Sequence, residues 1–536
     1  GHTLKFNTEI KGSGKNSRMV RNRKKRKEAR ETAMEGDLMD REERLQGDPW
    51  QKSQIFLGQR PHVPEPHIDE DSPAKPSNRV HIPIQIEKSS RLHIDKIPNK
   101  EDREIHSRIG LSNQFREQRR ETDRDLEDLP QCATAESIYM SHKTQDDVTF
   151  WAAVKKRLKF AEPEQNFKQL KKKTTLGRYM ASEFLRRFKI SAVRDQLLLD
   201  DCRNEFEKVK LKKSMELIEN HSGRSDPDAM MDEVKIFLKN QLCTKFEKRF
   251  CEGKAGQTIA CFHHNILNYF SPYCRYMEKK IASAMPDYVY IHQKRNFKEL
   301  DEYVKARLKG GICVESDYEA YDASQDATVL AFEIAIMEHM DLDQTFIEDY
   351  KLMKCTLGSK LGSLAIMRFT GEFCTFLFNT LANIAFTNMR YIWRKETILF
   401  AGDDMCAFGD LPVNKEHDAF FERLTLKAKV NRTETPMFCG WRLTFFGLFK
   451  EPKLVLDRLN IAREKGTLAD CLNSYFEEFL FAYDQGFRLE LMMDMEQMEA
   501  HHSCARRFLS NQNLLSQANR FKLREMVPDA TEYNSE

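Results

Sequence analysis

The chain has 536 residues and a mass of 62.9 kDa, more than one ordinary hydrophobic core supports, so we expect two or more subdomains. Hydrophobic residues make up 40% and charged residues 32% of the sequence, and no run of about 18 apolar residues occurs, which argues against a membrane-spanning protein. The 86 basic and 83 acidic residues nearly cancel to a net charge of +3, so overall charge alone does not indicate nucleic-acid binding.

Residues 1–145 differ in composition from the rest of the chain. They hold about half of the 17 prolines, few aromatic residues and charge runs such as residues 21–27, so we expect a largely disordered linker. The run at 21–27 is typical of a solvated charged tail, with RNA binding or a nuclear signal as the alternative. The chain begins with Gly1 rather than Met, and we expect a processed, tagged or excised piece of a longer protein.

Residues 146–310 are predicted to form a second, largely helical unit. The run 150–158 predicts an amphipathic helix with a basic face, and basic clusters follow at residues 171–173 and 186–187. Four of the 13 cysteines lie in the later part of this unit, near two histidines, but their spacing fits no zinc ribbon or finger. The chain has no C-x-x-C pair, so we expect reduced, scattered thiols.

After Gly310 the pattern changes to short β-like runs between helices, and residues 311–450 form the third expected unit. The run 312–316 predicts a strand that places Asp317 near its end, and Asp322 follows five residues later. Acidic pairs at this spacing occur by chance in most proteins of this length. The pair alone therefore indicates little.

A mostly apolar helix is predicted after Gly371. Thr375, Asn379 and Asn383 fall at i, i+4 and i+8 and form one polar stripe on it. A buried polar stripe needs partners, which hydrogen bonds within a core would supply. The functional alternative is that Thr375 and Asn379 face a sugar, where Asn379 paired with Asp322 would test for a 2′-hydroxyl. Gly371 would let the backbone approach a nucleotide closely.

The segment around Gly402 carries the sharpest signal. Apolar runs at 397–401 and 405–408 flank Gly402, Asp403 and Asp404, which predicts a tight hairpin with two acids near its tip. Like charges repel and desolvation raises carboxyl pKa values, whereas a divalent cation removes both problems. Together with Asp317, these acids suit two-metal phosphoryl transfer with Mg2+, or alternatively Mn2+. The other interpretation is a plain surface turn, which usually lies between polar strands.

Residues 451–536 form the last expected unit. From Thr467 the pattern is helical, with Phe476, Phe479, Leu480 and Tyr483 at helical spacing. Pairs of histidines at 263–264 and 501–502 are more typical of structural or exposed residues than of a metal site.

The order D-x4-D, T-G-E-x2-T-x3-N and G-D-D resembles palm motifs A, B and C of viral RNA-dependent RNA polymerases. The details are most similar to alphavirus-like replicases of the order Tymovirales, in particular flexivirus replicases. Similar segments occur at residues 149–158, 254–260 and 438–441, so the resemblance covers roughly residues 149–507 and leaves the first 145 residues outside. Motif B begins with Thr370 and Gly371 where many RNA polymerases have Ser-Gly, a departure that is normal for this group.

The resemblance implies an α+β (mixed α/β) fold with fingers, palm and thumb, in which the palm is an antiparallel sheet backed by helices. Residues 146–310 would hold an N-terminal extension and fingers. Residues 311–450 would hold the palm with an inserted fingers segment, and residues 451–536 the thumb.

The resemblance also implies roles for individual residues. The implied metal ligands are Asp317, Asp403 and Asp404. The implied sugar-contacting residues are Asp322, Gly371, Thr375 and Asn379. Lys245, Lys248 and Lys254 match a basic segment that holds the incoming triphosphate, although each alone is also an ordinary surface lysine. One lysine of the Lys427-Ala428-Lys429 run matches a residue proposed to protonate pyrophosphate, and we prefer Lys427 with Lys429 as the alternative.

The implied function is an RNA-directed RNA polymerase of a positive-strand RNA virus. It would add nucleotides from nucleoside triphosphates to an RNA 3′-hydroxyl, by a two-metal mechanism, in genome replication and transcription. The implied partners are template and nascent RNA, the helicase and methyltransferase parts of the same replicase and, indirectly, host membrane. The implied localisation is the host cytoplasm, in membrane-associated replication complexes.

Three other functions account for part of the pattern. A reverse transcriptase would ordinarily have Tyr or Phe before the paired acids, where this chain has Ala401 and Gly402. A metal-dependent nuclease would leave T-G-E-x2-T-x3-N unexplained. A non-catalytic RNA-binding protein with the same fold should have lost metal ligands, and none is lost.

Overall fold

The structure is a computed structural model that describes residues 105–106, 140–142, 147–211, 233–239, 241–243, 256–262 and 264–526. The expected linker at residues 1–145 lies outside these residues except for β1 (Ile105–His106) and β2 (Met140–His142). These two strands form a three-stranded sheet with β4 (Gln241–Cys243). The basic run at 21–27, Cys251 and His263 also lie outside the described residues.

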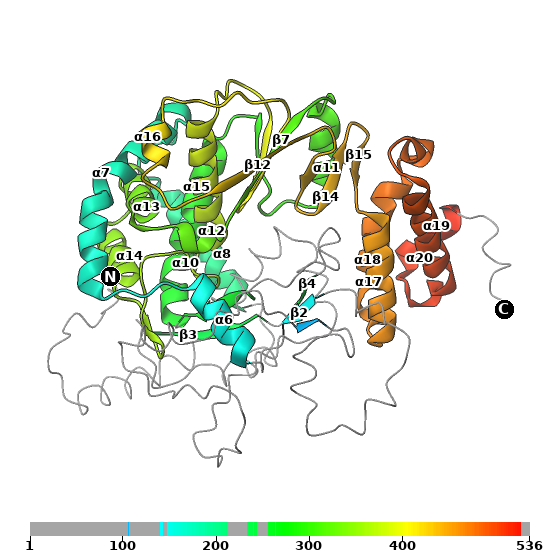
Figure 1. Ribbon diagram of the computed structural model, residues 1–536, viewed down its shortest axis with the longest axis horizontal. Helices are drawn as coiled ribbons and strands as arrows, with labels where there is room; N and C mark the ends of the chain where they lie inside the picture. Colours follow the sequence, from blue (N-terminus) through cyan, green and yellow to red (C-terminus); the bar gives the residue numbers. More distant parts are fainter. Residues whose placement is uncertain are drawn as a thin grey trace, which may run out of the picture.

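Four helices come from the second expected unit, and they lie from the left edge toward the middle of Figure 1. They are α6 (Asp147–Arg157), α7 (Pro163–Arg187), α8 (Gln196–Leu211) and α10 (His264–Ala284). Helix α6 confirms the helix predicted at 150–158. Helix α7 packs closely on α13 (Ala327–His339) at Gly177, where a Cβ atom would lie 2.4 Å from the Cβ of Ala331. Only glycine allows this approach of the two helices.

A five-stranded sheet in the order β12-β7-β11-β10-β6 forms the centre of the molecule. Its strands are β6 (Val289–Ile291), β7 (Cys313–Tyr318), β10 (Ile398–Ala401), β11 (Asp404–Ala407) and β12 (Ala428–Thr433). Neighbouring strands are antiparallel except β6, which runs parallel to β10. The predicted strand at 312–316 and the predicted hairpin around Gly402 are both confirmed. Strand β7 extends two residues further than predicted, so Asp317 lies within the strand.

Two hydrophobic cores lie on the two faces of this sheet, because successive side chains of a strand point to opposite faces. Ile398 and Phe400 pack with α10, α13, α14 (Gln344–Thr356) and α15 (Thr375–Arg390). Leu399 and Ala401 pack with α11 (Phe297–Arg307) and with a small sheet. The small sheet consists of β13 (Met437–Phe438), β14 (Trp441–Thr444) and β15 (Gly447–Phe449).

The remaining elements connect or extend these layers. A fourth sheet, in the order β5-β3-β8-β9, consists of β3 (Glu233–Leu238), β5 (Thr258–Cys261), β8 (Gly358–Ser359) and β9 (Gly362–Ser363). The short helices α12 (Tyr321–Ser324) and α16 (Asp418–Phe421) follow β7 and precede β12, respectively.

The C-terminal segment is helical, as predicted, and stands beside β15 at the right of Figure 1. It comprises α17 (Pro452–Glu464), α18 (Leu468–Tyr483), η4 (Gly486–Leu491), α19 (Met495–Ser510), η5 (Gln512–Leu514) and α20 (Gln517–Met526). Phe476 and Phe479 lie in a core of its own, formed mainly by these helices. No helix in the described part of the chain is long and apolar enough to span a membrane.

The expected α+β class is confirmed, since helices pack on largely antiparallel sheets. The expectation of fully reduced cysteines is wrong for one pair, because a disulfide joins Cys274 of α10 to Cys374 at the start of α15. The two cysteines are 100 residues apart in the sequence and meet only because α10 packs against the loop before α15. Spacing along the chain carries no signal for such a pair.

Candidate active site

The β10–β11 hairpin places two acids at the edge of the central sheet. Ala401 pairs with Asp404, so Gly402 and Asp403 form the two-residue loop. The φ angle of Gly402 is +57°, the left-handed geometry that such loops need at their first position. The tight turn predicted at Gly402 is therefore present, and glycine adopts its left-handed conformation without strain.

Helix α15 is hydrogen-bonded to this hairpin. The backbone N–H of Gly402 donates to Thr380 Oγ1 at 2.9 Å. The side-chain amide of Asn383 donates to the carbonyl oxygens of Gly402 and Asp404 at 3.0 and 3.1 Å. Asn383 Oδ1 in turn accepts from the hydroxyl of Tyr318 in β7 at 2.7 Å. Asn383, the last residue of the polar stripe predicted on this helix, therefore holds the hairpin tip in place. The sequence did not reveal this role.

The acids of two elements meet on one face of the sheet. Met405 pairs with Ser316, so Asp404 lies beside Asp317 one step further along the antiparallel strands. Desolvation, together with the negative charges of Asp404, Asp322 and Asp317, raises the pKa of Asp403 to about 7. Asp403 is exposed, and its carboxylate lies among like charges that repel it.

This set of side chains fits a hard divalent cation. Among the residues that the structure describes, no three His, Cys, Asp or Glu side chains already converge in a metal-binding arrangement. Desolvation and the negative charges of Asp404, Asp322 and Asp317 nevertheless raise the pKa of Asp403, as expected for a site that a cation would stabilise. Carboxylate oxygens are the ligands that Mg2+ prefers, and small side-chain movements bring such groups onto an ion.

The register also separates the two candidate lysines. Lys429 in β12 pairs directly with Asp317, so its side chain emerges on the same face as the acids. Lys427 precedes the strand, and its carbonyl oxygen accepts from the backbone N–H of Glu319. Both lysines are exposed. The pairing favours Lys429 over the Lys427 that we preferred from the sequence. Lys245, Lys248 and Lys254 lie outside the described residues.

The structure brings Asp322 and Asn379 together as expected. Asn379 Nδ2 donates to Asp322 Oδ1 at 3.0 Å, and Thr370 Oγ1 donates to the other carboxylate oxygen at 2.9 Å. Thr375 is placed differently, because its hydroxyl donates to the carbonyl oxygens of Phe369, at 3.2 Å, and Glu372. It thus closes the first turn of α15.

The structure requires glycine at position 371 for a reason that differs from the one expected. Its φ angle is +112°, and a Cβ atom would lie 2.1 Å from the carbonyl oxygen of Ala260 in β5. The neighbouring Thr370 carbonyl accepts from the N–H of Ala260 at 2.8 Å. The close approach that requires glycine here is therefore made by another strand of the protein.

The sequence did not reveal a group of four buried charges behind this site, formed by Glu333, Lys354, Arg368 and Glu372. One signal was present, since Glu333 lies in the middle of the apolar run of helix α13. A charged residue in such a segment needs a buried partner.

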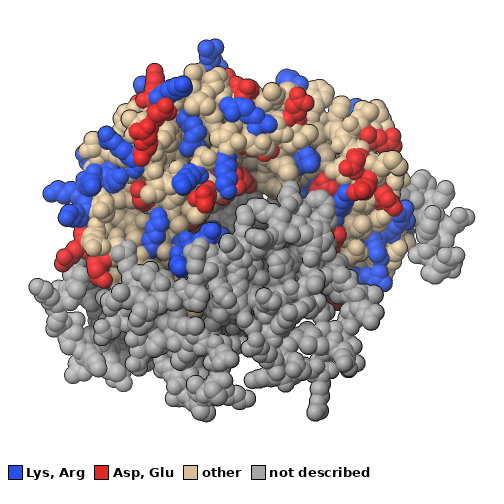
Figure 2. Space-filling view, viewed as in Figure 1, with Lys and Arg blue, Asp and Glu red and all other residues tan. Residues whose placement is uncertain are grey.

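Charges of both signs are interspersed over much of the face shown in Figure 2. Basic side chains gather at its left edge, over α7. The exposed basic residues of this helix are Lys168, Lys171, Lys172, Arg178 and Arg186.

Comparisons with known proteins agree with one family. A family model described as RNA dependent RNA polymerase matches residues 122–522. The match begins before residue 146, so the similarity reaches into the segment that we expected to lie outside it. An RNA-directed RNA polymerase of Apple chlorotic leaf spot virus is 49% identical over 491 residues, 91% of this chain and 26% of the relative.

Two further relatives carry related names. An RNA replication polyprotein of Citrus leaf blotch virus is 46% identical over 88% of this chain and 24% of its own length. An RNA replication protein of Potato virus S is 46% identical over 63% of this chain and 96% of its own length. The chain spans about a quarter of the first two relatives.

Proposed function

Because the chain belongs to the RNA-dependent RNA polymerase family, within the alphavirus-like replicases of the Tymovirales, we propose that it copies RNA for a positive-strand RNA virus. The reaction would join a nucleotide from a nucleoside triphosphate to the 3′-hydroxyl of the growing RNA and release pyrophosphate. The observation that carries this proposal is the register that sets Asp404 beside Asp317 on adjacent strands, with Asp403 in the loop directly before Asp404.

In this proposal the three aspartates hold the catalytic ions, Mg2+ or alternatively Mn2+. Two such ions, when bound, lower the pKa of the attacking hydroxyl and stabilise the leaving pyrophosphate. Asn383 and Thr380 keep the hairpin tip fixed, so that the carboxylates need little rearrangement. Lys429, beside Asp317, or Lys427 would donate a proton to pyrophosphate.

Asp322 and Asn379 would recognise the sugar. Their pairing leaves one amide N–H of Asn379 for a ribose hydroxyl, the group that distinguishes RNA from DNA precursors. Gly371 and Thr375 would act indirectly, by shaping the loop and the helix start that present these residues. Lys245, Lys248 and Lys254 would contact the triphosphate.

The five-stranded sheet with its helices would be the palm, the segment before residue 310 the fingers, and the helices after residue 451 the thumb. Residues 1–145 would link this unit to preceding parts of a replicase, including helicase and methyltransferase parts. We place the chain in the host cytoplasm, in replication complexes associated with membranes.

The test is primer extension on an RNA template with Mg2+. The unchanged protein should incorporate ribonucleotides, and Asp403→Ala should abolish incorporation. Asp410→Asn is the matched control, because Asp410 is an exposed aspartate that pairs with Arg432 away from the hairpin tip. Incorporation that survives in Asp403→Ala would show that the metal site lies elsewhere.

A further inference from the structure

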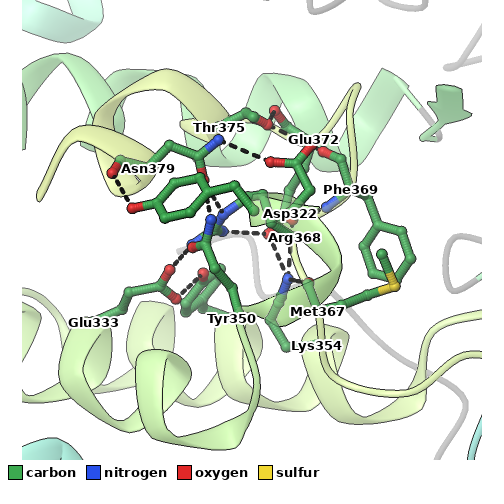
Figure 3. Close-up of polar contacts among 12 residues, drawn as sticks. Asp322, Glu333, Tyr350, Lys354, Met367, Arg368, Phe369, Glu372, Thr375 and Asn379 are labelled. Atoms are coloured by element: carbon green, nitrogen blue, oxygen red, sulfur yellow. Dashed lines mark hydrogen bonds and ion pairs between the residues drawn. The ribbon is translucent and has the colours of Figure 1, made fainter. Parts of the chain in front are cut away.

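Four buried charged side chains lie directly behind the Asp322–Asn379 pair (Figure 3). Arg368 and Lys354 are each 2% exposed, Glu333 is 1% exposed and Glu372 is fully buried. Two positive and two negative groups balance in formal charge. Such a cluster is costly to bury unless its geometry is well satisfied.

The four charges of the cluster pair with one another. Lys354 Nζ lies 2.9 Å from both carboxylate oxygens of Glu372. Arg368 forms ion pairs with Glu333 and with Glu372, the latter at 3.2 Å. Tyr350 donates to Glu333 at 2.7 Å, and burial together with Glu372 raises the pKa of this tyrosine, which keeps its hydroxyl a donor. The cluster therefore joins α13, α14 and the loop before α15 into one rigid support.

This support reaches the sugar-recognising pair through Arg368. Arg368 Nε donates to Asn379 Oδ1 at 3.3 Å, and Gln325 Nε2 donates to the same oxygen at 2.5 Å. Gln325 is itself held by Arg368 Nη2 at 3.4 Å. Two donors on Oδ1 decide which end of the amide points inward, and so direct Nδ2 at Asp322. The reversed amide would set Oδ1 against the carboxylate of Asp322, oxygen against oxygen.

We propose that Arg368 is a positioning residue for sugar selection, acting through the orientation of the Asn379 amide. This inference rests on the proposed function. Lysine at this position keeps the positive charge but lacks the planar fork that serves Glu333, Glu372, Gln325 and Asn379 at once. Arg368→Lys should therefore leave the amide less firmly oriented, and selection for the ribose should weaken.

The experiment measures kcat/KM for CTP and for 2′-deoxy-CTP on one template in single-nucleotide extension. The ratio of the two values should fall about tenfold in Arg368→Lys, as expected for the loss of one hydrogen bond involving a charged group. Arg458→Lys is the matched control, because Arg458 is 4% exposed and pairs with Glu478 at 3.5 Å in the C-terminal helices. Its ratio should equal that of the unchanged protein.

Measuring Arg368→Lys in a second protein, one that already carries Asn379→Ala, distinguishes positioning of Asn379 from a merely structural role. If Arg368 acts through Asn379, Arg368→Lys should not lower the ratio further in an Asn379→Ala protein. An additional fall of the same size there would overturn the inference. Should Arg368→Lys fail to fold, Glu333→Gln, which keeps shape and removes one ion pair of Arg368, is measured in the same two backgrounds.

Different results would overturn the positioning role and the polymerase proposal. A protein that selects ribonucleotides together with an Arg368→Lys variant of equal ratio would overturn the positioning role alone. A protein that incorporates no nucleotide would overturn the polymerase proposal and this inference with it.

Discussion

The hairpin tip gathers charges of one sign, whereas the buried cluster pairs charges of opposite sign. At the tip, Asp403 stands among Asp404, Asp322 and Asp317, and its pKa rises to about 7. In the cluster, Glu333 and Glu372 are matched by Arg368 and Lys354, and all four are buried. The acids of the tip are thus partly exposed and crowded, whereas those of the cluster are buried and balanced.

The two regions differ in which charges the fold itself needs. A balanced buried cluster is satisfied by the protein alone, and removing one member leaves an uncompensated charge. A crowded set of like charges is unfavourable until something positive arrives. We therefore expect substitutions at the tip to act on activity and substitutions in the cluster to act on stability.

The largest effect should come from Asp404→Asn. Nucleotide incorporation should fall on the order of 10²–10³-fold, because a metal ligand supplies several kcal/mol of transition-state stabilisation. The thermal midpoint without divalent cations should not fall, since one of several like charges is removed. Extension rates and thermal unfolding in EDTA measure the two quantities. A large drop in the thermal midpoint would contradict the expectation that substitutions at the hairpin tip act on activity and leave stability unchanged.

The cluster should show the converse in Glu372→Gln. The free energy of unfolding should fall by about 3–5 kcal/mol, because Lys354 would lose the carboxylate that it pairs with and Arg368 would keep only that of Glu333. Denaturant unfolding measures the change. The matched control is Glu205→Gln, because the side chain of Glu205 is 45% exposed where it pairs with Lys279 and, at 3.9 Å, with Arg275. That change should cost no more than about 1 kcal/mol.

The smallest effect concerns pH. A carboxyl whose pKa is raised from 3.8 to about 7 holds a proton in the folded state that the unfolded chain has lost. Between about pH 4 and pH 7 the folded state therefore binds more protons, and stability falls as pH rises. Thermal midpoints in EDTA should show this decline, and Mg2+ should raise the midpoint more at pH 7 than at pH 5. Asp403→Asn should remove the decline that this group causes, and an identical pH dependence in that variant would contradict the assignment.

The features that sequence could predict are those encoded within a few residues. The hairpin around Gly402 follows from two apolar runs and a glycine at the turn, and β7 follows from a short apolar run before Asp317. The pairing of Asp322 with Asn379 was predicted from motif order, and the structure confirms the contact.

The features that sequence could not predict depend on distant segments meeting. Arg368 meets Glu333 and Gln325 only because α13 and α12 pack beside the loop before α15. Gly371 is required by Ala260, more than a hundred positions earlier in the chain. Register places Lys429 beside Asp317, and no local pattern contains this register.

Helix α15 carries both Asn379, which contacts Asp322, and Asn383, which contacts the hairpin carbonyls. The two residues are one turn apart, a separation of about 5–6 Å along a rigid helix. The distance from the Asp322–Asn379 pair to the hairpin tip is therefore set by the pitch of one α-helix. Inserting a single residue between them would rotate one amide about 100° away from its target, so length changes in this turn are excluded even where side-chain changes are tolerated.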